Sequence, residues 1–266
     1  MIEAHWKLSR RAFANTPDPD FVYQSPTFAE GYARLLYDAT DLRGGLSLIT
    51  GEIGCGKTML ARALADRLSG TSCDVIVLSY PKVTPTQLLA TVAAGVGLDK
   101  APRGKLALVE ALGVRLGELH DAGRRPVLIV DEAQLASPSL LEEIRLFSNY
   151  EGRQDKHLHV ILLGQPELRD RIRKRPQIDQ RVSLRFHVEP MEADEVRGYV
   201  EHRLTVAGWN GVRIFTDDAF TALAARSAGI PRRINTLATQ ALFVGAMRKL
   251  ASIDGELMFD VADDQE

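Results

Sequence analysis

Eight consecutive residues, 51–58, have the types and the spacing of a phosphate-binding loop, G-x-x-x-x-G-K-T. In such a loop, glycines let backbone N–H groups close around a pyrophosphate, the lysine reaches the β- and γ-phosphates, and the threonine hydroxyl binds Mg²⁺. Residues 45–50 before the loop are typical of a buried strand, and residues 59–68 after it are typical of a helix. We therefore predict that a nucleoside triphosphate is bound by Gly51, Glu52, Ile53, Gly54, Cys55, Gly56, Lys57, Thr58 and Met59.

A second pattern, the apolar run 126–130 followed by Asp131 and Glu132, indicates hydrolysis. A strand of a parallel sheet is buried on both faces, which explains the unbroken apolar run, and ligands bind beyond the carboxyl ends of such strands. Asp131 would hold Mg²⁺ together with Thr58, and Glu132 would polarise the attacking water as a general base. The guanine-recognition pattern Asn-Lys-x-Asp is absent from the sequence. We therefore predict an ATPase that uses ATP and Mg²⁺.

The amino-acid composition is ordinary for a globular protein and does not indicate a particular partner. The chain has 266 residues, of which 45% are hydrophobic and 26% charged, and its net charge of −2 gives no overall attraction to nucleic acid or membrane. Its two cysteines, Cys55 and Cys73, lack disulfide or metal-ligand spacing, which favours a reducing compartment. No run approaches the roughly 18 apolar residues of a membrane span, and no signal peptide is expected. We expect a cytoplasmic protein without a membrane span of its own.

The order of the elements predicts an α/β fold with two domains. Strands are expected at 45–50, 74–79, 126–130, 159–164 and 182–188, and they alternate with helices at 28–40, 59–68, 84–96, 106–121 and 137–148. After Pro190 only helical patterns remain, at 192–207, 216–227 and 231–250. We therefore predict a three-layer αβα nucleotide-binding domain with a parallel sheet over residues 1–189. An all-helical lid domain would follow over 190–266 and end in a frayed acidic tail from Phe259.

Several further segments carry a family resemblance. A phosphate-binding α/β domain followed by a small helical lid resembles the AAA+ ATPases. Residues 15–23, 127–134, 142–149, 164–168 (GQPEL) and 229–235 (GIPRRIN) resemble more narrowly the ExeA/GspA-like ATPases of secretion and envelope-assembly systems. That resemblance covers about residues 6–250. The chain departs from it at Phe28, where the family often has a histidine. It also resembles, more distantly, the TniB-, TnsC- and IstB-like AAA+ regulators of DNA transposition.

The resemblance implies roles for residues outside the two motifs. Gln165 corresponds to the sensor-1 residue, which contacts the γ-phosphate or the lytic water, and Arg232 corresponds to the sensor-2 arginine of the lid. Arg181 corresponds to the arginine finger that enters the neighbouring subunit's site, with Arg185 as an alternative. Tyr23 is a candidate adenine neighbour, with core packing as the alternative. The resemblance thus implies ATP hydrolysis at the subunit interfaces of a homo-oligomer, an ATP-promoted ring or spiral.

The partner on which the ATPase acts is left open by the sequence. The first hypothesis is a protein partner, anchored in the membrane, whose secretion or envelope complex the ATPase powers or regulates from the inner-membrane periphery. The second is DNA, contacted by the basic segment Arg169, Arg171, Arg173, Lys174 and Arg175. The same segment can also be a solvated helix beside the arginine finger. A third hypothesis is a scaffold that ATP binding alone assembles, against which the intact Glu132 argues.

Overall fold

The computed structural model describes residues 1–266 except 17, 43–44, 99–101, 152–155 and 265–266. By its contacts the chain divides into two compact units. The first, which we call the sheet unit, comprises Glu30–Gly51 and Leu60–Val188; the second, the helical unit, comprises Met1–Ala29, Glu52–Met59 and Glu189–Glu266. The helical unit thus includes the N-terminal segment and most of the phosphate-binding loop. The division into domains 1–189 and 190–266 stays a prediction.

The sheet unit is built on a five-stranded parallel sheet in the order β2-β3-β4-β1-β5. The strands are β1 (Leu46–Gly51), β2 (Cys73–Leu78), β3 (Arg125–Val130), β4 (His159–Gly164) and β5 (Val182–Val188). All residues of β1 and β4 are buried, including the polar Ser47, Thr50 and His159, as expected for strands covered on both faces. The predicted α/β class and parallel sheet are confirmed.

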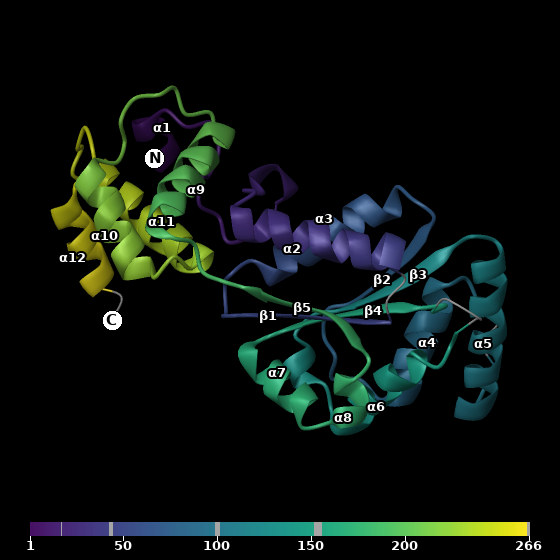
Figure 1. The fold of residues 1–266 in the computed structure, drawn as a ribbon. Coiled ribbons are helices and arrows are strands. Elements are labelled where there is room, and N and C mark those ends of the chain that lie inside the picture. The colour runs from purple at the N-terminus through teal and green to yellow at the C-terminus, as the bar shows by residue number, and fades with distance from the viewer. Residues whose placement is uncertain (17, 43–44, 99–101, 152–155, 265–266) are drawn as a thin grey trace. The chain divides into compact units, whose positions relative to one another are not determined.

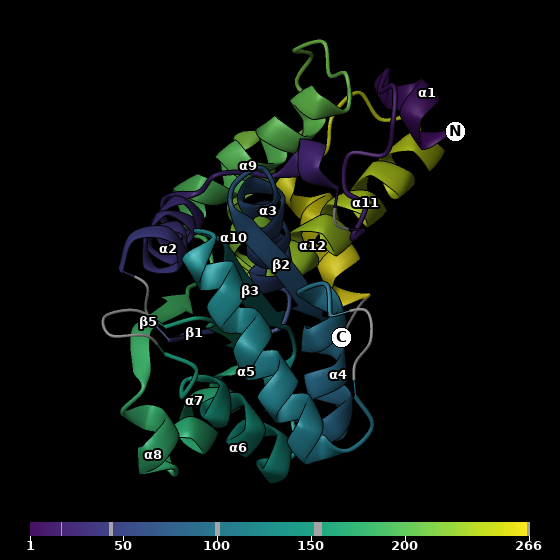
Figure 2. The ribbon, with the colours of Figure 1, turned by 90° about the vertical axis from the view of Figure 1, so that its right-hand side faces the viewer.

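Helices cover both faces of this sheet (Figures 1 and 2). The parts of α2 (Pro26–Tyr37) and α3 (Lys57–Ser69) that belong to the sheet unit lie over one face. Over the other face lie α4 (Pro85–Gly95), α5 (Lys105–Asp121), α6 (Pro138–Phe147), α7 (Pro166–Arg173) and α8 (Pro176–Asp179). Successive strand residues point to opposite faces, so Leu128 and Leu162 share one apolar cluster with Leu88, Leu112 and Ile144 of the covering helices. The π-helical turn η2 (Asp38–Leu42) and the 3₁₀ turn η3 (Ala133–Leu135) complete the unit.

Local capping explains where two of these helices begin. The Thr84 hydroxyl accepts a hydrogen bond from Gln87 N at 3.2 Å, and the Gln87 side chain accepts one from Thr84 N at 2.8 Å. This reciprocal pair is a capping box, and a proline occupies the first turn of the helix. Ser137 caps α6 by accepting from Leu140 N at 3.1 Å, again ahead of a proline. Both helix starts agree with the sequence prediction.

The helical unit contains α1 (Ile2–Trp6), the 3₁₀ turn η1 (Pro19–Phe21), α9 (Ala193–Val206), α10 (Asp217–Ser227), α11 (Pro231–Met247) and α12 (Gly255–Asp263). Its core combines Trp6, Phe13 and Phe21 of the N-terminal segment with the apolar faces of the C-terminal helices. The Trp6 indole N–H donates to the carbonyl of Leu242 at 2.8 Å, so this buried aromatic ring is both packed and hydrogen-bonded.

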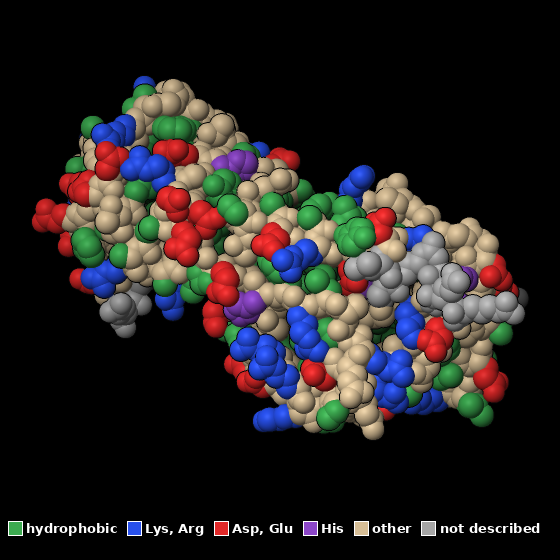
Figure 3. Space-filling model, viewed as in Figure 1, with side chains coloured by type: hydrophobic (Ala, Val, Ile, Leu, Met, Phe, Trp, Pro, Cys, Tyr) green, Lys and Arg blue, Asp and Glu red, His purple; other side chains and the backbone are tan. Residues whose placement is uncertain are grey.

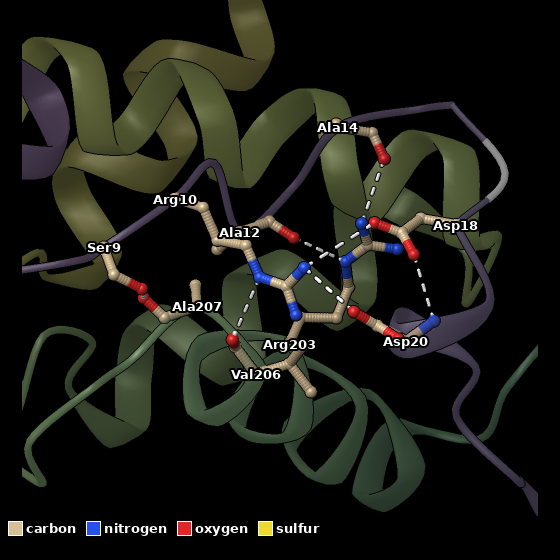
Figure 4. Close-up of polar contacts among 9 residues, drawn as sticks. All are labelled: Ser9, Arg10, Ala12, Ala14, Asp18, Asp20, Arg203, Val206 and Ala207. Atoms are coloured by element: carbon tan, nitrogen blue, oxygen red, sulfur yellow. Dashed lines mark hydrogen bonds and ion pairs between the residues drawn. The ribbon is translucent and has the colours of Figure 1, made fainter.

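An arginine of α9 fastens the N-terminal segment to the helical unit (Figure 4). Arg203 is buried and donates to the carbonyls of Ala12 at 2.7 Å and Ala14 at 2.9 Å. Nearer the surface, Arg10 donates to the carbonyl of Val206 at 3.2 Å. The Arg203 guanidinium thus satisfies two carbonyls of the segment, and Arg10 of the segment satisfies a carbonyl of α9.

The prediction of a frayed tail from Phe259 is wrong for the residues that the structure describes up to Asp263. They form the second half of α12, in which Val261 and Ala262 are buried. The Asp254 carboxylate accepts from Leu257 N at 3.0 Å and caps the helix, and the apolar residues recur at helical spacing. Capping and burial therefore outweigh the acidic composition. Gln265 and Glu266, the last residues of the predicted tail, lie outside the described residues.

Candidate functional site

The phosphate-binding loop connects the end of β1 at Gly51 to the start of α3 at Lys57. Gly54 and Gly56 have φ angles of +88° and +96°, a backbone conformation that residues with a side chain rarely adopt. The loop closes on itself, because Cys55 N donates to the carbonyl of Glu52 at 3.3 Å and Lys57 Nζ donates to the same carbonyl at 2.8 Å. A Cβ atom added at Gly56 would meet no atom within 4 Å. Open space at this glycine and the helix start that follows suit an anion held by backbone N–H groups.

Within the helical unit, the middle of this loop contacts the first turn of α11. Arg232 N donates to the carbonyl of Gly54 at 3.3 Å. A Cβ atom at Gly54 would lie 2.7 Å from Arg232 Cβ and 3.2 Å from Ile230 Cγ2, so only glycine permits this approach. The Arg232 side chain itself is exposed. The structure therefore brings the predicted sensor-2 residue next to the predicted phosphate-binding loop.

Cys55, the cysteine of the phosphate-binding loop, is buried. Burial raises the pKa of the Cys55 thiol, and the nearby Lys57 ammonium offsets only part of that effect. The thiol is therefore held in its neutral form, which is the less reactive one.

The two acids predicted to act in hydrolysis follow β3 directly. Asp131 is buried, its backbone N–H donates to the carbonyl of Leu78 at 3.0 Å, and its Oδ1 accepts from Glu132 N at 2.8 Å. Glu132 has a φ angle of +50°, so the chain turns sharply at the end of the strand. A non-glycine residue in this left-handed conformation costs about 1–2 kcal/mol, which the surrounding contacts must offset.

A glutamine that the sequence analysis gave no role links the two predicted catalytic positions. Gln134 Nε2 donates to Glu132 Oε2 at 2.5 Å, while Gln134 Oε1 accepts from the backbone N of Gln165 at 3.2 Å. Glu132 follows β3 and Gln165 follows β4, and these strands pair side by side. Gln134 belongs to segment 127–134, which carried part of the family resemblance, and that was its only signal in the sequence.

The basic segment of α7 separates into two groups of side chains. Arg171 donates to the carbonyls of Gln134 and Ala136, the latter at 2.6 Å, and Arg175 donates to the carbonyl of Arg171 at 2.8 Å. Burial, with a contribution from the charge of Arg175, lowers the pKa of Arg171. The other three cations, Arg169, Arg173 and Lys174, are exposed. Lys and Arg side chains gather over this region of the surface (Figure 3).

The two candidates for the arginine finger lie in different environments. Arg185 of β5 pairs with the Asp179 carboxylate at 3.0 Å and donates to the Asp179 carbonyl at 2.7 Å. Arg181 follows α8 and is half-buried. The Arg185 guanidinium thus binds its own chain, and the role of either arginine in a neighbouring subunit stays a prediction.

Tyr23 packs against α9 of the helical unit. Its ring meets that of Tyr199 edge-on at 5.8 Å and lies 5.6 Å from that of His202. Burial raises the pKa of its hydroxyl, followed by the effect of the acidic residues Glu195 and Asp194. These contacts support the core-packing alternative, and the adenine contact stays a prediction.

The predicted Mg²⁺ ligands, Thr58 and Asp131, have the right chemistry for this ion. Mg²⁺ prefers oxygen donors and is usually held by one or two carboxylates together with substrate phosphates. Asp131 supplies a buried carboxylate at the carboxyl edge of the sheet, and Thr58 supplies a hydroxyl in the first turn of α3.

Comparison with known proteins agrees with this fold. A family model described as an AAA domain matches residues 41–172. The chain is 38% identical over 252 residues to General secretion pathway protein A of Aeromonas hydrophila. That match covers 93% of this chain but 45% of the relative, so the chain spans less than half of that relative's length.

Solved structures show the same fold at low sequence identity. The Aeropyrum pernix ORC2 protein, in its ADPNP-ADP complexes, superposes with a TM-score of 0.71 at 18% identity, covering 96% of this chain and 72% of that one. Drosophila ORC bound to DNA gives 0.73 at 16% identity, covering 99% and 65%. Among the described residues, no helix has both the length and the apolar character that a membrane crossing requires.

Proposed function

This chain is an AAA+ protein similar to General secretion pathway protein A, and we propose that it binds and hydrolyses ATP at the subunit interfaces of a homo-oligomer. One observation carries the proposal above the others. The acid that would activate water, Glu132, is tied through Gln134 to the residue after β4, where an AAA+ protein carries its sensor.

Each group in the proposed mechanism has a separate task. The backbone of residues 51–59 holds the triphosphate, and Lys57 neutralises its terminal phosphates. Mg²⁺, held by Thr58 and Asp131, would neutralise further charge on the β- and γ-phosphates. Glu132 orients the attacking water and draws on its proton, and the Gln165 amide supports the same water or the γ-phosphate. Arg232, whose backbone N–H donates to the carbonyl of Gly54 in the loop, would direct its guanidinium to the γ-phosphate.

The last charge is proposed to come from another subunit. Arg181 of a neighbour would neutralise the charge that develops on the transferred phosphoryl group. Arginine fingers of this kind raise turnover by about 10³–10⁵. Turnover by the isolated monomer would then be slow, and ATP would promote assembly into rings or spirals because it completes the contact between neighbours.

The similarity to General secretion pathway protein A supports a role in secretion. We propose that the protein acts in the cytoplasm, at the inner-membrane periphery, and powers or regulates assembly of a secretion or envelope complex through a membrane-anchored protein partner.

Steady-state hydrolysis of ATP with Mg²⁺, measured by phosphate release, tests the chemistry. Lys57→Ala should abolish nucleotide binding, whereas Glu132→Gln should keep binding and lose turnover. Arg181→Ala should lose turnover, and Arg185→Ala, its matched control, should keep it. Mixing Glu132→Gln with Arg181→Ala should restore activity, because one protein supplies the finger and the other the intact acid. Wild-type protein without turnover at any concentration would refute the proposal, and mixtures that stay inactive would refute the shared site.

A second candidate function, DNA binding, is favoured by the three exposed cations Arg169, Arg173 and Lys174 at α7. The other two arginines of the segment bind backbone carbonyls of this chain, which restricts the candidate contact to these three side chains. Anisotropy of labelled double-stranded DNA, with and without a non-hydrolysable ATP analogue, tests this function.

Substituting glutamine for all three cations should remove the binding. Where each contacts one phosphate, the slope of log K against log salt should fall by about 0.9 per cation. Lys57→Ala is the nucleotide-blind control. No binding at micromolar protein and low salt would exclude the DNA function.

A further inference from the structure

We propose that Gln134 is a positioning residue for hydrolysis, which holds the Glu132 carboxylate in its working orientation and couples it to the end of β4. The inference rests on the proposed ATPase function and deepens it. Gln134 lies two residues beyond Glu132 in the η3 turn, and its side chain makes one hydrogen bond in each direction.

The chemistry of the bridge requires an amide. The Gln134 N–H₂ group donates to Glu132 Oε2, while the carbonyl oxygen on the same side chain accepts from Gln165 N. A carboxylate at this position could accept but not donate, and an ammonium group could donate but not accept. An amide does both and adds no charge beside Glu132. Hydrogen bonds to a carboxylate are also stronger than those between neutral groups.

The space around the bridge is fitted to this side chain. A Cβ atom at Gly164 would lie 2.8 Å from Gln134 Oε1 and 2.7 Å from Leu168 Cδ2. Any larger residue at the end of β4 would therefore displace the amide from Gln165 N. The glycine before the predicted sensor leaves room for the glutamine that follows the predicted general base.

The backbone beneath Gln134 is held by the basic segment. The Arg171 guanidinium donates to the carbonyls of Gln134 and Ala136, which flank the exposed Leu135. Leu135 N donates to the carbonyl of Glu132 at 2.8 Å, and the intervening Ala133 is fully buried. The amide is thus held at its backbone by Arg171 and at its side chain by two partners, so it can impose an orientation on Glu132.

This arrangement has a direct consequence for catalysis. With Oε2 engaged by the amide, Oε1 is the Glu132 oxygen directed by the bridge to receive water. Without the bridge, the Glu132 side chain would rotate among several orientations, and only a fraction of them would serve a general base. Loss of Gln134 should therefore lower kcat and leave ATP binding and folding close to wild type.

Two variants of nearly unchanged size separate the two hydrogen bonds. Gln134→Leu removes both, whereas Gln134→Glu keeps an acceptor for Gln165 N, removes the donor and sets a second carboxylate beside Glu132. We expect kcat to fall by roughly 10–100-fold in both variants, by analogy with the loss seen when hydrogen-bond partners of metal ligands are removed. KM, the Kd for a fluorescent ATP analogue and the melting temperature should stay near wild-type values.

A double-mutant cycle distinguishes positioning from a structural role. In a Glu132→Ala background the Gln134→Leu change should cost less than about twofold in residual turnover, because there is no carboxylate left to orient. Equal losses in both backgrounds would overturn the inference, as would a Gln134→Glu variant with wild-type kcat. If Gln134→Leu melts well below wild type, Gln134→Glu at normal stability decides the question.

The failure of this inference can be told apart from failure of the proposed function. Wild-type protein that hydrolyses ATP, together with Gln134 variants of unchanged kcat, overturns the role of Gln134 alone. Wild-type protein that binds the analogue but never releases phosphate overturns both.

Discussion

Replacement of Arg203 by methionine should loosen the N-terminal segment from the helical unit (Figure 4). The Arg203 side chain is 5% exposed, donates to the carbonyls of Ala12 and Ala14, and donates to the Tyr199 hydroxyl at 3.0 Å. Its guanidinium also lies 4.7 Å from the ring centre of Phe21. Methionine fills similar space and leaves these acceptors without a donor. A buried acceptor left unsatisfied costs about 1–3 kcal/mol, so two of them cost roughly 2–6 kcal/mol.

The expected result is a fall in melting temperature on the order of 10 °C, since 1 kcal/mol corresponds to about 2–4 °C in a protein of similar size. Circular dichroism would measure melting, and the rate of tryptic cleavage at the exposed Arg11 would report release of the segment.

Arg10→Met is the matched control. Arg10 belongs to the segment and binds Val206 of α9 and Asp20, but its side chain is 42% exposed. Exposed pairs contribute about 0–1 kcal/mol, so this variant should melt near wild type. Equal melting of the two arginine variants, with equal cleavage at Arg11, would refute the idea that burial makes Arg203 the fastening residue.

Three further predictions concern single side chains. Gly54→Ala should weaken binding of a fluorescent ATP analogue by at least about tenfold, because its Cβ adds a 2.7 Å contact at a φ of +88°. Gly70→Ala, where the nearest atom lies at 3.7 Å, should bind normally. Burial lowers the pKa of His202 in the folded protein below its value of about 6.5 in the unfolded chain. The folded protein is therefore most stable, with respect to this group, above about pH 6.5. It loses stability as the pH falls further, because the unfolded chain binds the proton first. The melting temperature should therefore fall less between pH 7 and pH 5 in His202→Gln than in wild type. Ser47→Ala removes one of two serine donors to Oδ2 of the buried Asp38 carboxylate, Ser183 being the other. A hydrogen bond to a charged group contributes about 1.5–3 kcal/mol, so the variant should lose roughly that much in urea unfolding.

Much of the sheet unit could be predicted because its signals are local. Strand runs such as 126–130 are continuously apolar, as favoured for a parallel strand buried on both faces. The helix starts at Thr84 and Ser137 could be predicted because the capping residue, the proline and the first turn are adjacent in sequence. The pattern of a phosphate-binding loop could be recognised for the same reason, since its eight residues are adjacent in sequence.

The contacts that the sequence did not predict join residues far apart in the chain. Arg171 is 37 residues from Gln134, and the composition of its segment indicated an electrostatic surface instead of two hydrogen bonds to backbone. Arg203 reaches Ala12 across 191 residues, which no periodic pattern records. Long, flexible side chains form such contacts only after the fold has brought their partners together. The sequence therefore does not distinguish an arginine that binds a backbone carbonyl from one that is exposed to solvent.

The contact between Gly54 and Arg232 suggests how bound phosphate would be sensed. Two helices begin beside the phosphate-binding loop, α3 through the covalent chain and α11 through the hydrogen bond from Arg232 N. Each helix start carries partial positive charge from its unpaired N–H groups, and α11 adds two exposed arginines in its first turn. An anion in the loop would therefore act on α11 through charge as well as through packing at Gly54. Because the loop and α11 belong to one compact unit, the helical unit needs no separate relay to register whether the loop holds a phosphate.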